Sequence, residues 1–304
     1  MAFLLINTGT RQGGILSGIL FNYYMKESID KLVCQDVGCM LGPFKTNVIA
    51  YADDIVIMCP SANGLQILLD NFQESIKSDN LTINVKKSKY MIMKHAKSFK
   101  FDPKVYLNQV PLERVYEHKY LGIIIMDSLS NSSDADRATN SFLKQFNSMY
   151  YRFNFAEKNV LNYLFKTYSS SFYGIELWYN DKNRKKVLRT PAVAYHKAVK
   201  KICSLSPYDS NHYACEIVGV DIFTHLQSKR MFKYCYSLLK SDNDFMRKIK
   251  YYISFQSHIK KNVSRIFRSE YDVVNVFLND FDAVYSRINY VQKNEPRSIF
   301  LNSI

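Results

Sequence analysis

The 304-residue sequence has no long apolar run, although 47% of its residues are hydrophobic. A membrane-spanning helix needs roughly 18 consecutive apolar residues, so we expect no membrane partner. The opening MAFLLI is too short for a signal-peptide core and is interpreted as part of a strand. Internal repeats and low-complexity tracts are also missing, which excludes solenoid and fibrous classes. The composition therefore predicts a globular protein with a substantial core.

Paired cysteine motifs are missing as well. The six cysteines form no CxxC pair, so we expect buried thiols in a reducing, intracellular setting, nuclear or cytoplasmic. Cys203, His212 and Cys215 include a single HxxC. Structural zinc sites usually show two ligand pairs, so zinc there stays a minor alternative.

Acidic residues are in deficit, with 27 Asp or Glu against 41 Lys or Arg and a formal charge of +14. Most of the excess lies in residues 181–270, which carry 19 basic and 7 acidic residues. Solvated helix faces would explain this charge, and so would a surface that contacts nucleic-acid phosphates. The density of seven residues favours the phosphate surface: Arg184, Lys185, Lys186, Arg189, Lys197, Lys200 and Lys201.

Two adjacent acids interrupt the apolar stretch NVIAYADDIVIMCP, residues 47–60. The pattern predicts two short strands joined by a turn at Ala52, Asp53 and Asp54. Two carboxylates at such a turn form a hard-oxygen site suited to Mg²⁺. The alternative is an ordinary Asp-rich turn, since Asp favours turns.

The wider pattern predicts an α+β unit over residues 1–130, an antiparallel sheet with helices packed on one face. A helix is expected around 65–76, a strand at 88–94, and a second hairpin with its turn at Asn108 and Gln109. SDADRATN, residues 133–140, is interpreted as a linker. Residues 131–304 are predicted to form an all-α basic region.

The motifs TRQGGILSGILFN, YADD, LTINVKKSKYMIM and KYLGI follow one another in that order. This order resembles the palm of a reverse transcriptase, most closely that of non-LTR (LINE-type, jockey-like) retrotransposons. The later SSSFYGIELW and AYHKAVKKI are similar to the thumb region of the same elements. The resemblance implies a partial polymerase palm followed by a thumb-like region. It also implies addition of dNTPs to a DNA primer 3′-hydroxyl on an RNA template, by two-metal phosphoryl transfer with Mg²⁺ or Mn²⁺.

The same resemblance assigns roles to single residues. It makes Asp53 the principal metal ligand and catalytic residue and Asp54 its partner. The residues assigned to nucleotide or template are Arg11, Gln12, Gly13, Gly14, Tyr51 and Lys87. The residues assigned to the primer are Tyr120, Leu121 and Gly122. A core aromatic at Tyr51 and a solvated lysine at position 87 are the plain alternatives.

The sequence also departs from the family. Gly18 stands where the family usually has proline, and the chain begins ten residues before Arg11. An acidic D-x-x-x-A-F-D-like strand would lie further upstream, so we expect an N-terminal truncation that removes this strand, the fingers and the endonuclease. Two rival functions therefore stay open: a catalytically dead fragment that only binds RNA or DNA, and a host-domesticated nucleic-acid-binding protein.

Overall fold

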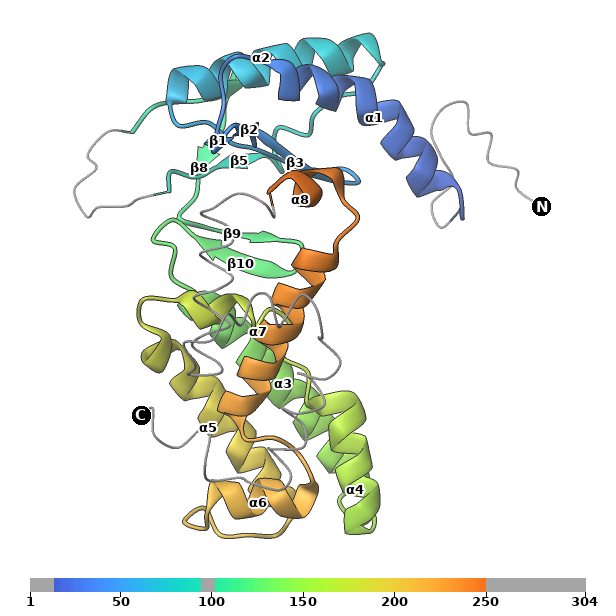
Figure 1. The fold of residues 1–304 in the computed structure, drawn as a ribbon, viewed down its shortest axis with the longest axis vertical. Helices are drawn as coiled ribbons and strands as arrows, with labels where there is room; N and C mark the ends of the chain where they lie inside the picture. Colours follow the sequence, from blue (N-terminus) through green and yellow to red (C-terminus); the bar gives the residue numbers. More distant parts are fainter. Residues whose placement is uncertain (1–13, 94–101, 250–304) are drawn as a thin grey trace. The chain divides into compact units, whose positions relative to one another are not determined.

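The computed structural model describes residues 14–93 and 102–249 (Figure 1). The chain divides into two compact units, residues 1–120 and 121–304. The division falls ten residues before the predicted boundary and lies between two strands, β9 (Glu117–Tyr120) and β10 (Ile123–Met126).

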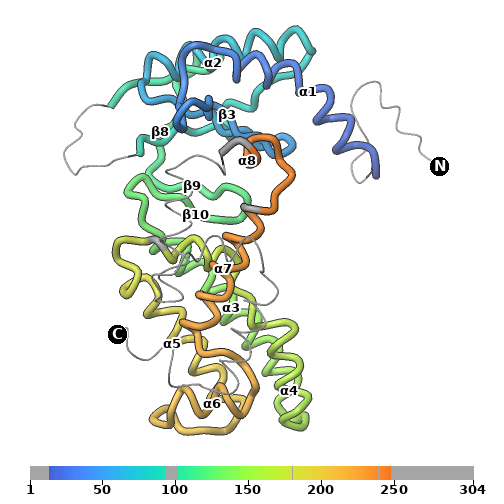
Figure 2. The backbone as a smooth tube through the Cα atoms, in the orientation of Figure 1, coloured from blue at the N-terminus to red at the C-terminus, as the bar shows by residue number. Residues whose placement is uncertain are grey.

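The first unit is built on two helices and a hairpin. The helices are α1 (Ser17–Cys34) and α2 (Ala62–Ser78), and the hairpin strands are β3 (Val48–Tyr51) and β4 (Asp54–Ile57). Met25, Leu32, Leu68, Phe72 and Ile76 form the core, and inward residues of the hairpin pack against it. In Figure 2, α1 and α2 lie side by side in space, and the two helices contact each other. The apolar stripe predicted for the helix around 65–76 therefore packs in this core with the inward face of the hairpin.

Six further short strands lie among the described residues of the first unit, besides β9. They are β1 (Met40–Leu41), β2 (Phe44–Lys45), β5 (Lys89–Tyr90), β6 (Tyr106–Leu107), β7 (Val110–Pro111) and β8 (Glu113–Arg114), of which β1 and β2 precede the hairpin. Strands β6 and β7 form the predicted second hairpin, and positive φ angles at Asn108 and Gln109 identify a type I′ turn. The prediction of one antiparallel sheet was wrong, because the described strands form two-stranded ladders and β5 pairs with β8 in parallel. The expected strand at 88–94 shortens to Lys89–Tyr90.

The second unit is mainly helical. After β10 come α3 (Ser132–Phe153), α4 (Lys158–Leu164), a π-helical turn at Phe165–Ser169, a 3₁₀ turn at Leu177–Asn180, α5 (Arg184–Ile202), α6 (Asn211–Val218), α7 (Phe223–Lys240) and α8 (Asp244–Ile249). The interpretation of residues 133–140 as a linker was wrong, because they form the first turns of α3. Ala135 and Ala138 pack in the core there. The polar composition of residues 133–140 therefore gave no sign that one face of this helix is buried.

Aromatic side chains dominate the core of the second unit. Phe142 lies 4.7 Å from Phe172 between ring centroids, and Phe165 packs edge-on against Phe142 at 6.3 Å. Tyr195 and Phe223 complete the cluster and bring α5 and α7 against α3. Such ring pairs add about 0.5–1.5 kcal/mol each beyond their buried area. This cluster fixes the position of α5, which carries the basic residues described below.

A neutral histidine in this unit leads to a pH prediction. His196 Nε2 accepts the Phe223 backbone N–H at 3.3 Å, at the start of α7. Burial, and secondarily the charge of Lys200, lowers the pKa of His196 from its usual 6.5 to about 4. The unfolded chain therefore binds more protons between these values, and folding stability falls as the pH drops from 6.5 to 4. We expect a contribution of at most about 3 kcal/mol.

Urea unfolding of the wild type and of His196→Gln at pH 7 and pH 4.5 measures this contribution. Carboxylates titrate in both proteins, so only the difference between them reports on position 196. The variant should lose less stability on acidification than the wild type. Equal losses would show that His196 does not couple to folding.

Candidate active site

The Asp53 and Asp54 pair lies at the tip of the β3–β4 hairpin. The register pairs Tyr51 with Asp54, so Ala52 and Asp53 form a two-residue turn. Ala52 adopts a φ of 51°, in the left-handed region that alanine seldom occupies. The sequence prediction of two strands joined at this turn is confirmed. Backbone strain of this kind often accompanies functional positions.

Both carboxylates are exposed at the turn. Within residues 14–93 and 102–249, no hydrogen bond or ion pair engages the side chain of Asp53 or Asp54. Exposed, uncommitted carboxylate oxygens have the donor chemistry that Mg²⁺ and Mn²⁺ require. In the same ranges, no group of three or more His, Cys, Asp or Glu side chains is arranged to hold a metal. Among the described residues, the hairpin thus offers two exposed carboxylates of suitable chemistry and no complete metal-ligand group.

Tyr120 extends this site in a way that the sequence did not predict. Its hydroxyl is buried and has no hydrogen-bond partner among the described residues. Burial, and then the negative charge of Asp54, raises the pKa of Tyr120. Both residues belong to the first unit, and the effect of Asp54 on Tyr120 couples a residue assigned to the primer to the acidic hairpin. An unsatisfied buried hydroxyl is costly, and a ligand that accepts a hydrogen bond from it would remove that cost.

The other residues assigned to nucleotide or template lie as follows. Tyr51 is 66% exposed, so it is not a core aromatic. Lys87 is exposed in a turn where its backbone N–H donates to the carbonyl of Asn84 at 3.1 Å. Gly14 lies three residues before the first residue of α1, and its carbonyl accepts the N–H of Ser17 at 3.1 Å. Arg11, Gln12 and Gly13 lie outside the described residues.

Leu121 and Gly122 belong to the second unit and form a turn before β10. Both adopt positive φ angles, 46° and 83°. The Tyr173 hydroxyl donates to the Leu121 carbonyl at 3.1 Å. A Cβ at position 122 would lie 3.3 Å from the Tyr173 ring, so glycine is required by both conformation and space. Sequence reasoning missed Tyr173, because nothing local links it to a turn 52 residues away.

The seven basic residues of α5 separate into two groups. Arg184 donates to Gln227 at 2.8 Å and lies over the Tyr179 ring, and the buried Lys200 donates to the Pro207 carbonyl at 2.8 Å. These two side chains are committed to internal contacts. The other five are exposed: Lys185, Lys186, Arg189, Lys197 and Lys201. Their spacing places them along one side of the helix, opposite the face that meets α3. We call these five residues the α5 basic stripe.

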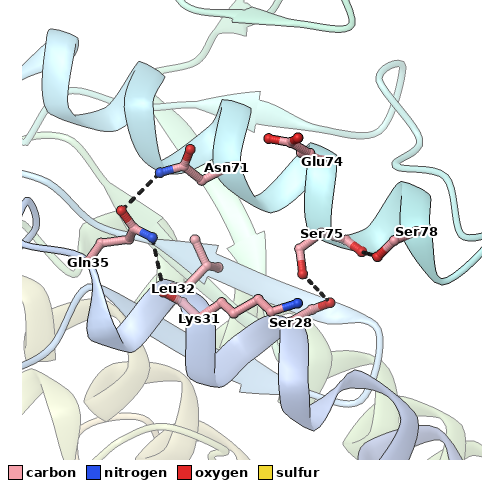
Figure 3. Close-up of a pocket in the computed structure, with 8 residues that line it drawn as sticks. All are labelled: Ser28, Lys31, Leu32, Gln35, Asn71, Glu74, Ser75 and Ser78. Atoms are coloured by element: carbon pink, nitrogen blue, oxygen red, sulfur yellow. Dashed lines mark hydrogen bonds between the residues drawn. The ribbon is translucent and has the colours of Figure 1, made fainter.

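The cysteines and a hollow between α1 and α2 do not add to the acidic site. Cys203 and Cys215 are buried, and burial raises the pKa of both thiols. A hollow of about 360 Å³ lies between α1 and α2, with Ser28 hydrogen-bonded to Ser75 at 2.8 Å and Asn71 to Gln35 at 2.9 Å (Figure 3). Neither Asp53 nor Asp54 lines it. In the described part of the chain, no helix has the length and apolar character to cross a membrane.

Comparisons with known proteins bear on the first unit above all. The family described as reverse transcriptase (RNA-dependent DNA polymerase) matches residues 2–125. A polyprotein from the type-2 retrotransposable element R2DM of Drosophila melanogaster is 34% identical over 126 residues, 38% of this chain and 11% of that protein. The RNA-directed DNA polymerase from the mobile element jockey of Drosophila funebris is 26% identical over 184 residues, 57% of this chain and 19% of that protein.

A polyprotein from the type-1 retrotransposable element R2 of Nasonia vitripennis is 27% identical over 150 residues, 45% of this chain and 14% of that protein. The chain thus spans less than a fifth of the length of each of these relatives. The Asp53–Asp54 hairpin, Tyr120 and the Leu121–Gly122 turn all fall within the segment that the family matches.

Proposed function

Because residues 2–125 belong to the reverse transcriptase family, we propose that this chain supplies the metal-binding hairpin and a nucleic-acid surface to an RNA-directed DNA polymerase of a non-LTR retrotransposon. The observation that carries the proposal is the tip of the β3–β4 hairpin. There two exposed carboxylates lie within the matched segment, and no described residue forms a hydrogen bond or ion pair with their side chains.

In this function, Asp53 and Asp54 hold Mg²⁺, or Mn²⁺ in its place. An ion held there would supply the positive charge that lowers the pKa of a primer 3′-hydroxyl and offsets the charge of the leaving pyrophosphate. Mg²⁺ commonly takes one or two carboxylates and completes its shell with water and substrate phosphates, which suits a two-carboxylate hairpin. Tyr51, exposed beside Asp54, offers a ring face to the primer end, and the Tyr120 hydroxyl offers a hydrogen-bond donor.

The α5 basic stripe supplies the second part of the proposal, contact with the phosphates of a primer–template duplex. Exposed lysines and an arginine on one side of a helix neutralise backbone phosphates without reading the sequence. Lys201 also lies over the Tyr150 ring, with its Nζ 4.4 Å from the ring centroid, which orders the C-terminal end of the stripe. Arg184 and Lys200 are left out of this surface because of their internal contacts.

Primer extension tests the proposed function. The full chain is incubated with dNTPs and a DNA primer annealed to an RNA template, with Mg²⁺, with Mn²⁺ or with no divalent ion. We expect extension only when a divalent ion is present. A folded chain that binds the primer–template without extending it would instead be assigned the nucleic-acid-binding alternative.

The basic stripe predicts a change in salt dependence. Replacing Lys186, Arg189 and Lys197 together with glutamine removes three phosphate contacts. The slope of log affinity against log salt concentration should then become shallower by about 2 to 3, since each contact contributes about 0.7 to 0.9. Fluorescence anisotropy with an RNA–DNA duplex at several salt concentrations measures the slope.

A control variant removes the same charge from ion-paired lysines of the first unit. Three such lysines pair with Glu27, Asp36 and Glu113: Lys31, Lys45 and Lys89. Their replacement with glutamine should leave the slope close to that of the wild type. If both triple variants change the slope equally, net charge rather than the stripe governs binding.

A further inference from the structure

A buried carboxylate at the start of α3 organises the second unit around the Leu121–Gly122 turn. The Asp134 side chain is fully buried. Its Oδ1 accepts the backbone N–H of Ile124 at 3.0 Å and the Arg137 guanidinium at 2.7 Å, and its Oδ2 accepts the Trp178 indole N–H at 2.8 Å. Three donors, one of them cationic, therefore compensate the buried charge.

These contacts connect the turn to the helices in two places. Through Ile124, Asp134 holds the first residues of β10, directly after Gly122. Arg137, the ion-pair partner of Asp134, donates through Nη2 to the carbonyl of Tyr173 at 3.0 Å. Tyr173 in turn binds the Leu121 carbonyl and packs under Gly122. The turn is therefore fixed at both ends by groups that belong to α3 and to the segment before α5.

The segment before α5 is itself fitted closely to Asp134. Gly174 has a φ of +89°, and a Cβ there would lie 3.3 Å from Asp134 Oδ2. A side chain at position 174 would crowd Asp134 and Ile123, the first residue of β10. Leu121 meanwhile keeps a left-handed conformation that is unfavourable for a non-glycine residue. A strained turn persists only where its surroundings hold it, and here the Tyr173 hydroxyl and the Asp134 contacts do so.

We propose that Asp134 and Tyr173 are positioning residues that hold the Leu121–Gly122 turn in the conformation that contacts the recessed 3′ end of a primer strand. This inference rests on the proposed function, which assigns the turn to primer binding. Neither residue touches the nucleic acid. Asp134 anchors β10 to α3, and Tyr173 orients the carbonyl and fixes the path of the turn. The turn can then present its backbone without reorganising when the primer binds.

Two matched variants test the inference in the full chain. Tyr173→Phe keeps the ring under Gly122 and removes only the hydroxyl that binds Leu121. Tyr168→Phe is the control, because Tyr168 is 64% exposed and makes no hydrogen bond or ring contact with the described residues. Affinity is measured for a recessed DNA primer on an RNA template and for a blunt duplex of equal length. The ratio of the two affinities reports on recognition of the primer end, whereas a purely structural role would alter the melting temperature without changing the ratio.

The single tryptophan of the chain gives a second readout, independent of catalysis. The indole N–H of Trp178 binds Asp134, so its NMR signal reports on the positioning network. We expect the recessed primer–template to shift this signal in the wild type and in Tyr168→Phe, and the blunt duplex to leave it unchanged. Tyr173→Phe should reduce the preference for the recessed end by about two- to tenfold, the effect of losing one hydrogen bond.

The outcomes separate the two proposals. If the wild type binds neither nucleic acid, or shows no preference for the recessed end, the proposed function fails and the inference fails with it. If the wild type prefers the recessed end and Tyr173→Phe keeps the full preference, the inference alone is overturned. A reduced preference in Tyr173→Phe, with that of Tyr168→Phe intact, supports it.

Discussion

Replacing Asp53 with asparagine should weaken the binding of Mn²⁺ or Mg²⁺ to this chain by at least about 100-fold. Even residues that only support a metal ligand change metal affinity by about 10- to 100-fold when they are mutated, and loss of the ligand itself should cost no less. The amide keeps the size and shape of the carboxylate but removes its negative charge and makes one of the two oxygens a nitrogen donor. Because Asp53 is exposed at a turn, the change should leave the fold intact.

Titration calorimetry with Mn²⁺ on the full chain measures this effect, and primer extension should fall in parallel. Asp36→Asn is the matched control, since Asp36 is an exposed acid of the same unit that interacts with Lys45 at 3.7 Å. Its metal affinity should stay within about twofold of the wild type, as expected for a surface substitution remote from the site. If the wild type and Asp53→Asn bound Mn²⁺ with equal affinity, Asp53 and Asp54 would be residues of an ordinary Asp-rich turn and not metal ligands.

The features that the sequence predicted well are those determined by residues close in the chain. The β3–β4 hairpin follows from apolar residues on both sides of Asp53 and Asp54. The Asn108–Gln109 turn follows from residue types that tolerate positive φ. Ser61, immediately before α2, also has a residue type that caps helices, and its hydroxyl accepts the Gly64 N–H at 3.1 Å.

The features that sequence reasoning missed depend on distant residues. Asp134 lies in a polar octapeptide that reads as a linker, yet it is buried because Trp178, 44 residues further on, donates to it. Lys200 was grouped with the exposed basic residues of α5 from sequence. Its side chain is buried, and its Nζ donates to the Pro207 carbonyl in the loop after α5. Neither contact has a local signature, so no helical periodicity could reveal it.

The second large effect concerns Asp134. Replacing Asp134 with asparagine should lower the free energy of unfolding by about 3–5 kcal/mol, the cost of removing one partner from a buried ion pair. Three donors converge on the two carboxylate oxygens: Ile124 N–H, Arg137 and Trp178. An asparagine amide has only one acceptor oxygen, so its NH₂ group must face at least one of these donors. That donor is then buried without a partner, and Arg137 loses its counter-charge.

Urea unfolding followed by circular dichroism tests this expectation, with Asp136→Asn as the control two residues along the same helix. Asp136 is exposed and makes no hydrogen bond or ion pair with the described residues, so its replacement should change stability by no more than about 0.5 kcal/mol.

Combining Asp134→Asn with Trp178→Phe removes the donor that the amide would face. The double variant should therefore be less destabilised than the sum of the single variants, as expected for residues in direct contact. Additive losses, or an Asp134→Asn effect as small as the control's, would mean that the network does not hold α3, β10 and the Leu121–Gly122 turn together. The positioning role of Asp134 would then lose its physical basis.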